Sequence, residues 1–348
     1  MGWLMKFVFT ADWHLSRYGQ DKVEDTTNLP DRLHSTKNAI YFMTDYCREN
    51  DIDTMVIGGD LLHGKSVIYA VAQNILLDFF RDNQDLNFIV LDGNHDLSGK
   101  GTAVISALKS IDNEPNVNRI QGLFTKIEDV LLVPYSHKMI EIIKNSTAPV
   151  LVSHFGLNEG VLNSGISIVS DIGISSLVNK YKAVLLGHYH KPQEIIRDDI
   201  EVYYVGSPIQ LDRGEKHEEK RFLIVDTTKQ VISSVLTEGY RRYYEFELRK
   251  DNKDEIVTQA RKLIKEGHHV NIKRLEDVDT RDIAGDLRII DRVEKDITDR
   301  GISSSMTEAD KLRKFAEIRG IPEDEIEEYV NEALSVVSAC SEKQQLIV

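Results

Sequence analysis

The sequence has little cysteine and no long apolar run, and both shortages narrow the possible classes of protein. Its 348 residues include only Cys47 and Cys340, which are far apart and outside any Cys-x-x-Cys pair. This argues against a disulfide framework and against a cysteine zinc site. No apolar segment reaches the ~20 residues needed to cross a bilayer, and Asp12 and His14 interrupt the apolar start too early for a signal peptide. We therefore expect a cytoplasmic protein with no membrane contact.

Positive charge is also scarce. The sequence has 43 Lys and Arg against 57 Asp and Glu, a formal net charge of −14, whereas nucleic-acid-binding proteins usually carry a basic footprint. The excess of acidic residues is not spread evenly along the chain, because residues 240–300 contain 15 basic and 15 acidic residues. The charge therefore argues weakly against nucleic acid as a partner, and it leaves this neutral segment as the best place for a nucleic-acid contact.

Hydrophobic patterning predicts an α/β fold in three parts. Residues 1–238 alternate short runs rich in Val, Ile and Leu with longer amphipathic stretches, the pattern of a layered α/β domain with strands buried on both faces. Residues 239–300 repeat this alternation on a smaller scale and predict a cap domain. Residues 301–348 begin with a Ser-rich linker, Gly301–Ser305, and continue as two helices. The second helix has Ile326, Val330, Leu334 and Val337 on one stripe.

The predicted elements can be stated residue by residue. Strands are expected at Lys6–Thr10, Thr54–Ile57, Phe88–Leu91, Val130–Pro134, Val150–Ser153, Ala183–Leu186, Tyr203–Val205, Arg221–Asp226, Val231–Leu236, Tyr243–Leu248 and His269–Leu275. Helices are expected at Leu33–Arg48, Ile68–Arg81, Thr102–Ser110, Met139–Lys144, Asp254–Glu266, Leu287–Ile297, Thr307–Arg319 and Pro322–Ser338. A capping box of Ser305 and Glu308 opens the first C-terminal helix, and Gly320 suits its end.

Five polar motifs each fall at the end of a predicted strand. They are Asp12-Trp13-His14, Gly58-Gly59-Asp60-Leu61-Leu62-His63, Gly93-Asn94-His95-Asp96, Ser153-His154-Phe155-Gly156 and Gly187-His188-Tyr189-His190. Sites in open α/β sheets form outside the carboxyl ends of the strands, so these motifs are expected to converge. A single such motif is usually a polar turn, but five in one chain, holding six of the 11 histidines, make coincidence a poor explanation.

The residue types in these motifs are ligands for hard or borderline metal ions. Carboxylate, imidazole and amide oxygen suit Mn²⁺, Fe or Zn²⁺, and no thiolate is present. Asp60 is a natural bridge between two ions, because a carboxylate has two oxygens. Two ions ~3.5–4 Å apart can clamp a phosphoryl group and generate a hydroxide nucleophile.

In this order, the five motifs resemble those of the calcineurin-like metallophosphoesterases. The protein Ser/Thr phosphatase branch is disfavoured, because Asp60 is followed by Leu61-Leu62-His63 and not by Arg-Gly. That segment, with Tyr204-Val205-Gly206-Ser207-Pro208, is instead similar to the SbcD-type DNA repair nucleases. The resemblance covers about residues 5–226 and implies a layered αββα sandwich with a small α/β cap domain and C-terminal helices.

The resemblance also implies roles for individual residues. One Mn²⁺ would be held by Asp12, His14, Asp60 and His190, and the second by Asp60, Asn94, His154 and His188. His95 would protonate the leaving oxygen, Asp96 would orient His95, and His63 would contact the phosphate. Simpler alternatives are a turn cap for Asp96 and a solvated loop histidine for His63.

Partners follow from the same resemblance. It implies an Mn-dependent exonuclease and endonuclease subunit that works on DNA duplex ends, hairpins or single strands in double-strand-break repair and recombination. Its partner would be an SMC-like coiled-coil ATPase that docks on residues 301–348, and the chain would form a homodimer, in the host cytoplasm if a phage encodes it. Packing of the two helices on their own domain is the alternative. Two other functions remain open, a small-substrate phosphodiesterase and a non-catalytic scaffold.

Overall fold

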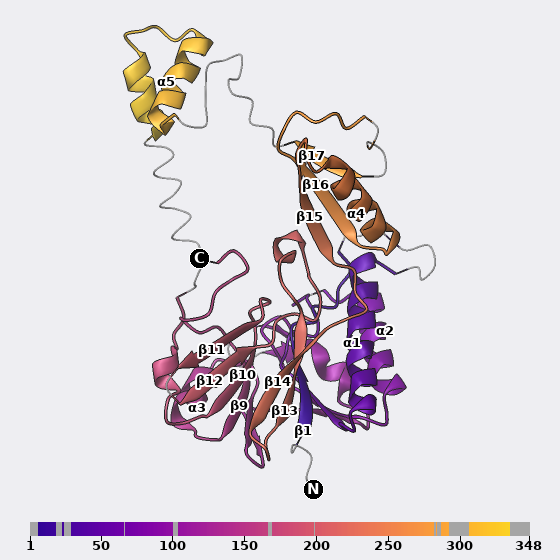
Figure 1. The fold of residues 1–348 in the computed structure, drawn as a ribbon. Helices are drawn as coiled ribbons and strands as arrows, with labels where there is room; N and C mark the ends of the chain where they lie inside the picture. The colour runs from indigo at the N-terminus through magenta and orange to yellow at the C-terminus, as the bar shows by residue number, and fades with distance from the viewer. Residues whose placement is uncertain are drawn as a thin grey trace. The chain divides into compact units, whose positions relative to one another are not determined.

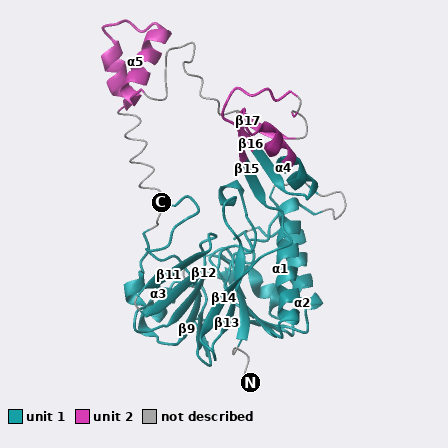
Figure 2. Cartoon of the chain, viewed as in Figure 1, with its two compact units in different colours: residues 1–245, 259–271 teal, residues 246–258, 272–348 magenta. Residues whose placement is uncertain are grey.

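The structure is a computed structural model, and it describes residues 6–18, 23, 29–65, 67–99, 104–165, 169–197, 199–281, 283, 287–291 and 306–334. The chain divides into two compact units (Figure 2), one of residues 1–245 and 259–271, the other of residues 246–258 and 272–348. In the described part of the chain, no helix is long and apolar enough to span a membrane.

The larger unit contains two six-stranded sheets (Figure 1). The first has the order β14-β13-β1-β2-β3-β6, and its centre is parallel from β1 to β6. Its strands are β1 (Lys6–Thr10), β2 (Thr54–Ile57), β3 (Asn87–Val90), β6 (Val117–Arg119), β13 (Arg221–Asp226) and β14 (Val231–Leu236). Because β1, β2 and β3 run the same way, the loops that follow them leave from one edge.

The second sheet has the order β11-β12-β10-β9-β8-β7 and a parallel centre from β8 to β12. Its strands are β7 (Thr125–Ile127), β8 (Val130–Val133), β9 (Val150–His154), β10 (Ala183–Gly187), β11 (Gln193–Arg197) and β12 (Ile200–Tyr204). The loops after β9 and β10 likewise leave from a shared edge.

Three hydrophobic clusters show that the sheets pack face to face between helices. Phe7, Phe9 and Val56 belong to the cluster between the sheets, together with residues of β9 and β10, whereas Val8 and Met55 belong to the outer cluster. The outer cluster includes α1 (Asp31–Glu49) and α2 (Ala70–Asp82), and α3 (Met139–Asn145) packs on the second sheet. Both faces of the central strands are therefore buried, which explains their uninterrupted apolar runs and confirms the layered α/β prediction.

Most predicted elements agree with the structure to within a few residues, and the exceptions are short or exposed. The helix expected at Thr102–Ser110 is wrong at Ile105–Ser106, where β5 pairs with β4 (Leu97–Ser98). Its second half is helical, as a 3₁₀ helix at Ala107–Ile111. The helix expected at Leu287–Ile297 is wrong at its start, because β17 (Arg288–Asp291) is a strand of a three-stranded sheet. Residues 292–297 lie outside the described residues. Strands β4, β5, β6, β7 and β11 were not predicted.

The remaining elements form a small sheet and two helical stretches. The sheet has the order β15-β16-β17, with β15 (Tyr243–Leu248), β16 (His269–Arg274) and helix α4 (Lys253–Lys265) as predicted. Helix α5 (Glu308–Arg319) begins at an N-cap on Thr307, whose hydroxyl accepts from the Asp310 amide, and ends at the left-handed Gly320. The expected cap Ser305 and the linker Gly301–Ser305 lie outside the described residues. Residues 326–334 are helical, and residues 335–338 of the predicted second helix are likewise not described.

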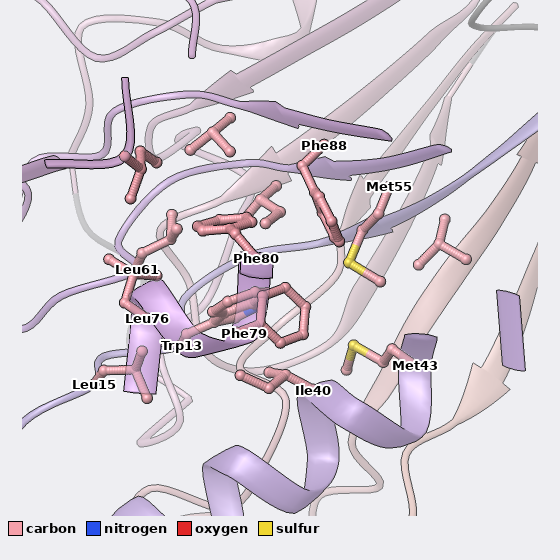
Figure 3. Packing of buried hydrophobic residues seen from close by; sticks show 14 of the residues in the cluster. Trp13, Leu15, Ile40, Met43, Met55, Leu61, Leu76, Phe79, Phe80 and Phe88 are labelled. Atoms are coloured by element: carbon pink, nitrogen blue, oxygen red, sulfur yellow. The ribbon is translucent and has the colours of Figure 1, made fainter. Parts of the chain in front are cut away.

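Phe79 is the centre of the aromatic packing under the first sheet (Figure 3). Its ring lies 5.1 Å from Trp13, 5.3 Å from Phe88 and 5.4 Å from Phe80, measured between ring centroids. The side chain is fully buried. If it were removed, neighbouring side chains could fill only part of the space that it leaves.

We expect Phe79→Ala to lower the free energy of unfolding by about 3–5 kcal/mol through lost burial and a residual cavity. Urea unfolding followed by circular dichroism would measure it, with Phe124→Ala as the control, because Phe124 is half exposed. A loss for Phe79→Ala no larger than that for the control would contradict the central role of this ring.

Candidate metal centre

The loops that follow five strands bring the predicted ligands together at one edge of the sandwich. The first sheet supplies residues that follow β1, β2 and β3, and the second supplies residues at the ends of β9 and β10. These residues are Asp12, His14, Asp60, His63, Asn94, His95, Asp96, His154, His188 and His190. The two sheets are tied here, because the His188 amide donates to both carboxylate oxygens of Asp12, at 3.1 and 3.0 Å.

One group of ligand atoms centres on His14. Its Nε2 lies 3.0 Å from Nε2 of His190 and 3.9 Å from Oδ1 of Asp12. These three residues present one ligand atom each within 4.8 Å of one another. When two ring nitrogens face each other, at most one of them can donate a proton to the other. A cluster of such acceptor atoms suits a cation at its centre.

A second group centres on Asn94 and His154. The side-chain oxygen of Asn94 lies 3.1 Å from Nε2 of His154 and 3.1 Å from Nδ1 of His188. Oδ2 of Asp60 lies 3.3 Å from Nε2 of His154 and 3.6 Å from Nε2 of His14. A single oxygen of Asp60 therefore lies between the two groups, while its other oxygen accepts from the His95 amide at 2.7 Å.

The backbone orients the ligand nitrogen of His154. Its Nδ1 lies 2.8 Å from the Gly58 carbonyl, and because a carbonyl only accepts, Nδ1 carries the proton and Nε2 can face a metal. Hydrogen bonding on the far ring nitrogen is the usual way that proteins orient metal-binding histidines. The residues present thus fit two divalent cations, with Oδ2 of Asp60 between the two groups of donors. That Asp60 would be shared by both ions stays a prediction.

The charges of the site also favour a cation. Burial lowers the pKa of His14 well below its usual value and that of His188 to about 4, so both imidazoles are neutral. Burial would lower the pKa of His154, but the carboxylates of Asp60 and Asp12 outweigh it and raise that pKa to about 9. Without metal, His154 is therefore an imidazolium between two carboxylates, and a bound cation would take over that positive charge.

Four of the ligands have unusual backbone conformations. Asp12, His14, Asp60 and His188 have positive φ angles of 56°, 47°, 55° and 97°, and they are half of the eight described non-glycine residues with this feature. Each such residue costs roughly 1–3 kcal/mol, and strain of this kind concentrates at functional sites. The sharp turns bring polar side chains into a space that regular strand ends would not reach.

His63 and His95 lie together beside His14. Their rings stack with centroids 5.1 Å apart, and Nδ1 of His95 donates to the His63 carbonyl at 2.9 Å. Nδ1 of His63 faces Nδ1 of His14 at 3.1 Å. His95 is partly exposed, and its Nε2 is the ring nitrogen left to meet a substrate.

Asp96 does not orient the His95 ring, which corrects the role expected from the sequence. Its buried carboxylate accepts instead from the backbone amides of Asp60 at 2.7 Å, Gly93 at 2.9 Å and Leu62 at 3.0 Å. Burial, reinforced by the nearby Asp60, raises the pKa of Asp96 well above its usual value. The role is closer to the alternative of a turn cap, because the carboxylate joins the loops after β2 and β3.

A cleft of about 890 Å³ opens beside Asn94. Arg119 on its wall is held by carboxylates, at 2.8 Å from Asp92 and 2.7 Å from Asp112. Leu123 and Tyr135 also line it and are 40% and 37% exposed. The site thus has a neighbouring space with polar and apolar surfaces, large enough for a nucleotide-sized group.

Comparison with known proteins identifies the family. The family model for calcineurin-like phosphoesterases matches residues 5–192. Over 342 residues the chain is 24% identical to exonuclease subunit 1 of Enterobacteria phage T4, across 94% of this chain and 92% of that protein. It is similar to the SbcD subunit of the SbcCD nuclease from Staphylococcus saprophyticus (24% identity, 66% of this chain and 67% of that protein) and from Staphylococcus epidermidis (21%, 77% and 78%). The chain belongs to the calcineurin-like phosphoesterase family and is a metal-dependent phosphoesterase.

Sequence reasoning missed two buried charged residues behind the site. Glu215 and Lys220 are both fully buried, and both contact His190. They lie in the charged stretch Arg213–Arg221, which lacks periodicity and in a sequence looks like solvated loop. The nearby Tyr204-Val205-Gly206-Ser207-Pro208 segment was the only signal that this region matters.

Gly93 leaves no room for a side chain beside Asp60. A Cβ at this position would lie 2.2 Å from Oδ1 and 2.4 Å from the amide nitrogen of Asp60. Both atoms are already hydrogen-bonded, to the His95 amide and the Asp96 carboxylate.

We expect Gly93→Ala to weaken Mn²⁺ binding at least tenfold (about 1.4 kcal/mol) by displacing Asp60, as calorimetry would show. Gly320→Ala is the control, since no described atom lies within 4 Å of its added Cβ and its left-handed backbone would strain the end of helix α5 and not Asp60. Unchanged Mn²⁺ affinity in Gly93→Ala would mean that Asp60 is not a ligand at the position described.

Proposed function

We propose that this chain is the nuclease subunit of a DNA-processing complex. It hydrolyses phosphodiester bonds with two divalent ions, and the proposed metal is Mn²⁺. The observation that carries the proposal is the convergence of seven ligands from both sheets, with Oδ2 of Asp60 between two groups of donors. Asp12, His14, Asp60 and His190 would hold one ion, and Asp60, Asn94, His154 and His188 the other. Such a pair clamps the phosphate and supplies a hydroxide nucleophile near neutral pH.

The protein's own side chains supply the proton and the position of the substrate. His95 is the general acid, because its Nδ1–H is committed to the His63 carbonyl and its Nε2 can carry the proton to the leaving oxygen. His63 contacts the phosphate from beside His14. Asp96 acts indirectly, because its carboxylate holds together the loops that carry Asp60 and His95.

DNA is preferred over a small phosphodiester as the substrate. The T4 relative is named an exonuclease subunit and aligns over 94% of this chain, including the part that follows the phosphoesterase sandwich. The cleft beside Asn94 accommodates the nucleotide next to the scissile bond, and residues 239–300 contact the backbone of duplex ends, hairpins or single strands. A small-substrate phosphodiesterase would need neither of the two segments that follow residue 238.

The word subunit in the relatives' names supports a larger assembly. We infer that residues 301–348 dock on an SMC-like coiled-coil ATPase, in the cytoplasm, and that two phosphoesterase domains form a homodimer. Helix α5 and residues 326–334 are joined by an ion pair of Arg313 with Glu327, at 2.6 Å, and Val330 is 1% exposed. They form a folded unit, and the complex would act in repair and recombination.

We expect the protein to cleave linear duplex DNA with Mn²⁺, and His95→Gln to slow cleavage about 10²–10⁴-fold through loss of the acid. Calorimetry should still show two bound Mn²⁺ in this variant, and His217→Gln, outside the site, should retain full activity. Hydrolysis of a small diester with no DNA cleavage, with or without an ATPase, would contradict the DNA proposal. Absence of both activities in metal-loaded protein would favour a scaffold.

Deletion of residues 302–348 tests the docking proposal. We expect the shortened chain to retain Mn²⁺-dependent cleavage, because all the proposed ligands and His95 precede the deletion, but to lose association with its ATPase. Analytical ultracentrifugation of the two proteins would measure the association. Equal association of the full and shortened chains would place the docking surface elsewhere.

A further inference from the structure

His190 is held from behind by two buried charges that no ligand role uses. Oε1 of Glu215 lies 3.5 Å from Nδ1 of His190, and Nζ of Lys220 donates to the His190 carbonyl at 2.8 Å. The two charged side chains pair with each other at 2.8 Å and are both fully buried. Glu215 thus restrains the ring of His190, and Lys220 restrains the backbone of the same residue.

The surroundings of Glu215 hold its carboxylate in place. Its Oε2 pairs with Nζ of Lys220 at 2.8 Å. Its oxygens also accept from the amide of Leu211 at 2.8 Å and the side chain of Asn163 at 2.8 Å. A carboxylate held by this many donors cannot turn away from the imidazole without leaving buried groups unpaired.

The geometry fixes which nitrogen of His190 carries the proton. A carboxylate only accepts, so the neutral ring of His190 carries its proton on Nδ1, toward Glu215, and leaves Nε2 bare toward His14, 3.0 Å away. A carboxylate behind a metal-binding imidazole orients the ring and makes it a stronger ligand, and removing such a partner commonly lowers metal affinity 10–100-fold.

We propose that Glu215, with Lys220 as its counter-charge, is a positioning residue that presents Nε2 of His190 to the metal site containing Asp12 and His14. The inference rests on the two-metal function proposed above. The competing explanation is that the buried pair only stabilises the loop that follows Ser207, whose amide also donates to the His190 carbonyl at 3.1 Å.

The test is Mn²⁺ binding, without DNA, to the full chain and to Glu215→Gln. We expect the variant to bind one of its two ions 10–100-fold more weakly and the other as in the wild type. The matched control is Glu218→Gln, because Glu218 also pairs with Lys220, at 2.6 Å, and has no described contact with the His190 ring. Its two Mn²⁺ affinities should stay within twofold of the wild type.

The possible outcomes separate the two explanations. A purely structural role would weaken the binding of both ions equally or leave both affinities unchanged, and either result overturns the inference alone. A wild-type chain that binds fewer than two Mn²⁺ overturns the proposed function as well. If the variant does not fold, ¹⁵N-histidine NMR of the metal-free wild type decides, since an Nε2–H tautomer of His190 would refute the assignment and an Nδ1–H tautomer supports it.

Discussion

Face-to-face packing of the two six-stranded sheets is the constraint on which the rest of the structure depends. The proposed ligands are divided between the sheets, with Asp12, His14, Asp60 and Asn94 on one and the histidines at the ends of β9 and β10 on the other. Their separation is therefore set by the apolar layer of Phe7, Phe9 and its neighbours between the sheets. A close-packed interior transmits small volume changes, so the metal centre is as much a product of this core as of its own loops.

The electrostatics follow from the same arrangement. Burying carboxylates and imidazoles at the seam between the sheets raises or lowers their pKa values by desolvation, and only a cation can satisfy all of them together. The net charge of −14 is then less at odds with a phosphate substrate, since some acidic residues are ligands that bound ions would neutralise. Under the proposed function, the neutral segment 239–300 and a basic partner would be the contacts for a DNA backbone.

The sequence predicts secondary structure correctly wherever burial imposes a hydrophobic pattern on it. Runs such as Lys6–Thr10 and Thr54–Ile57 are buried on both faces, and both strands have the predicted bounds. Half-buried strands of two or three residues, such as Leu97–Ser98, carry no period that could identify them. The ten predicted residues lie together because strand ends converge, but the contacts of Asp96 and the burial of Glu215 depend on loop conformation, which no local pattern encodes.

The left-handed backbone at Asp12, His14, Asp60 and His188 has a consequence for how such a protein would change over generations. Each of these residues holds a conformation that glycine or asparagine adopts with less strain, so selection for stability alone would replace them. Only a continuing requirement for the ligands opposes that drift. A descendant freed from catalysis would therefore lose these four side chains early and gain stability in doing so, while its two sheets and their apolar interior persisted.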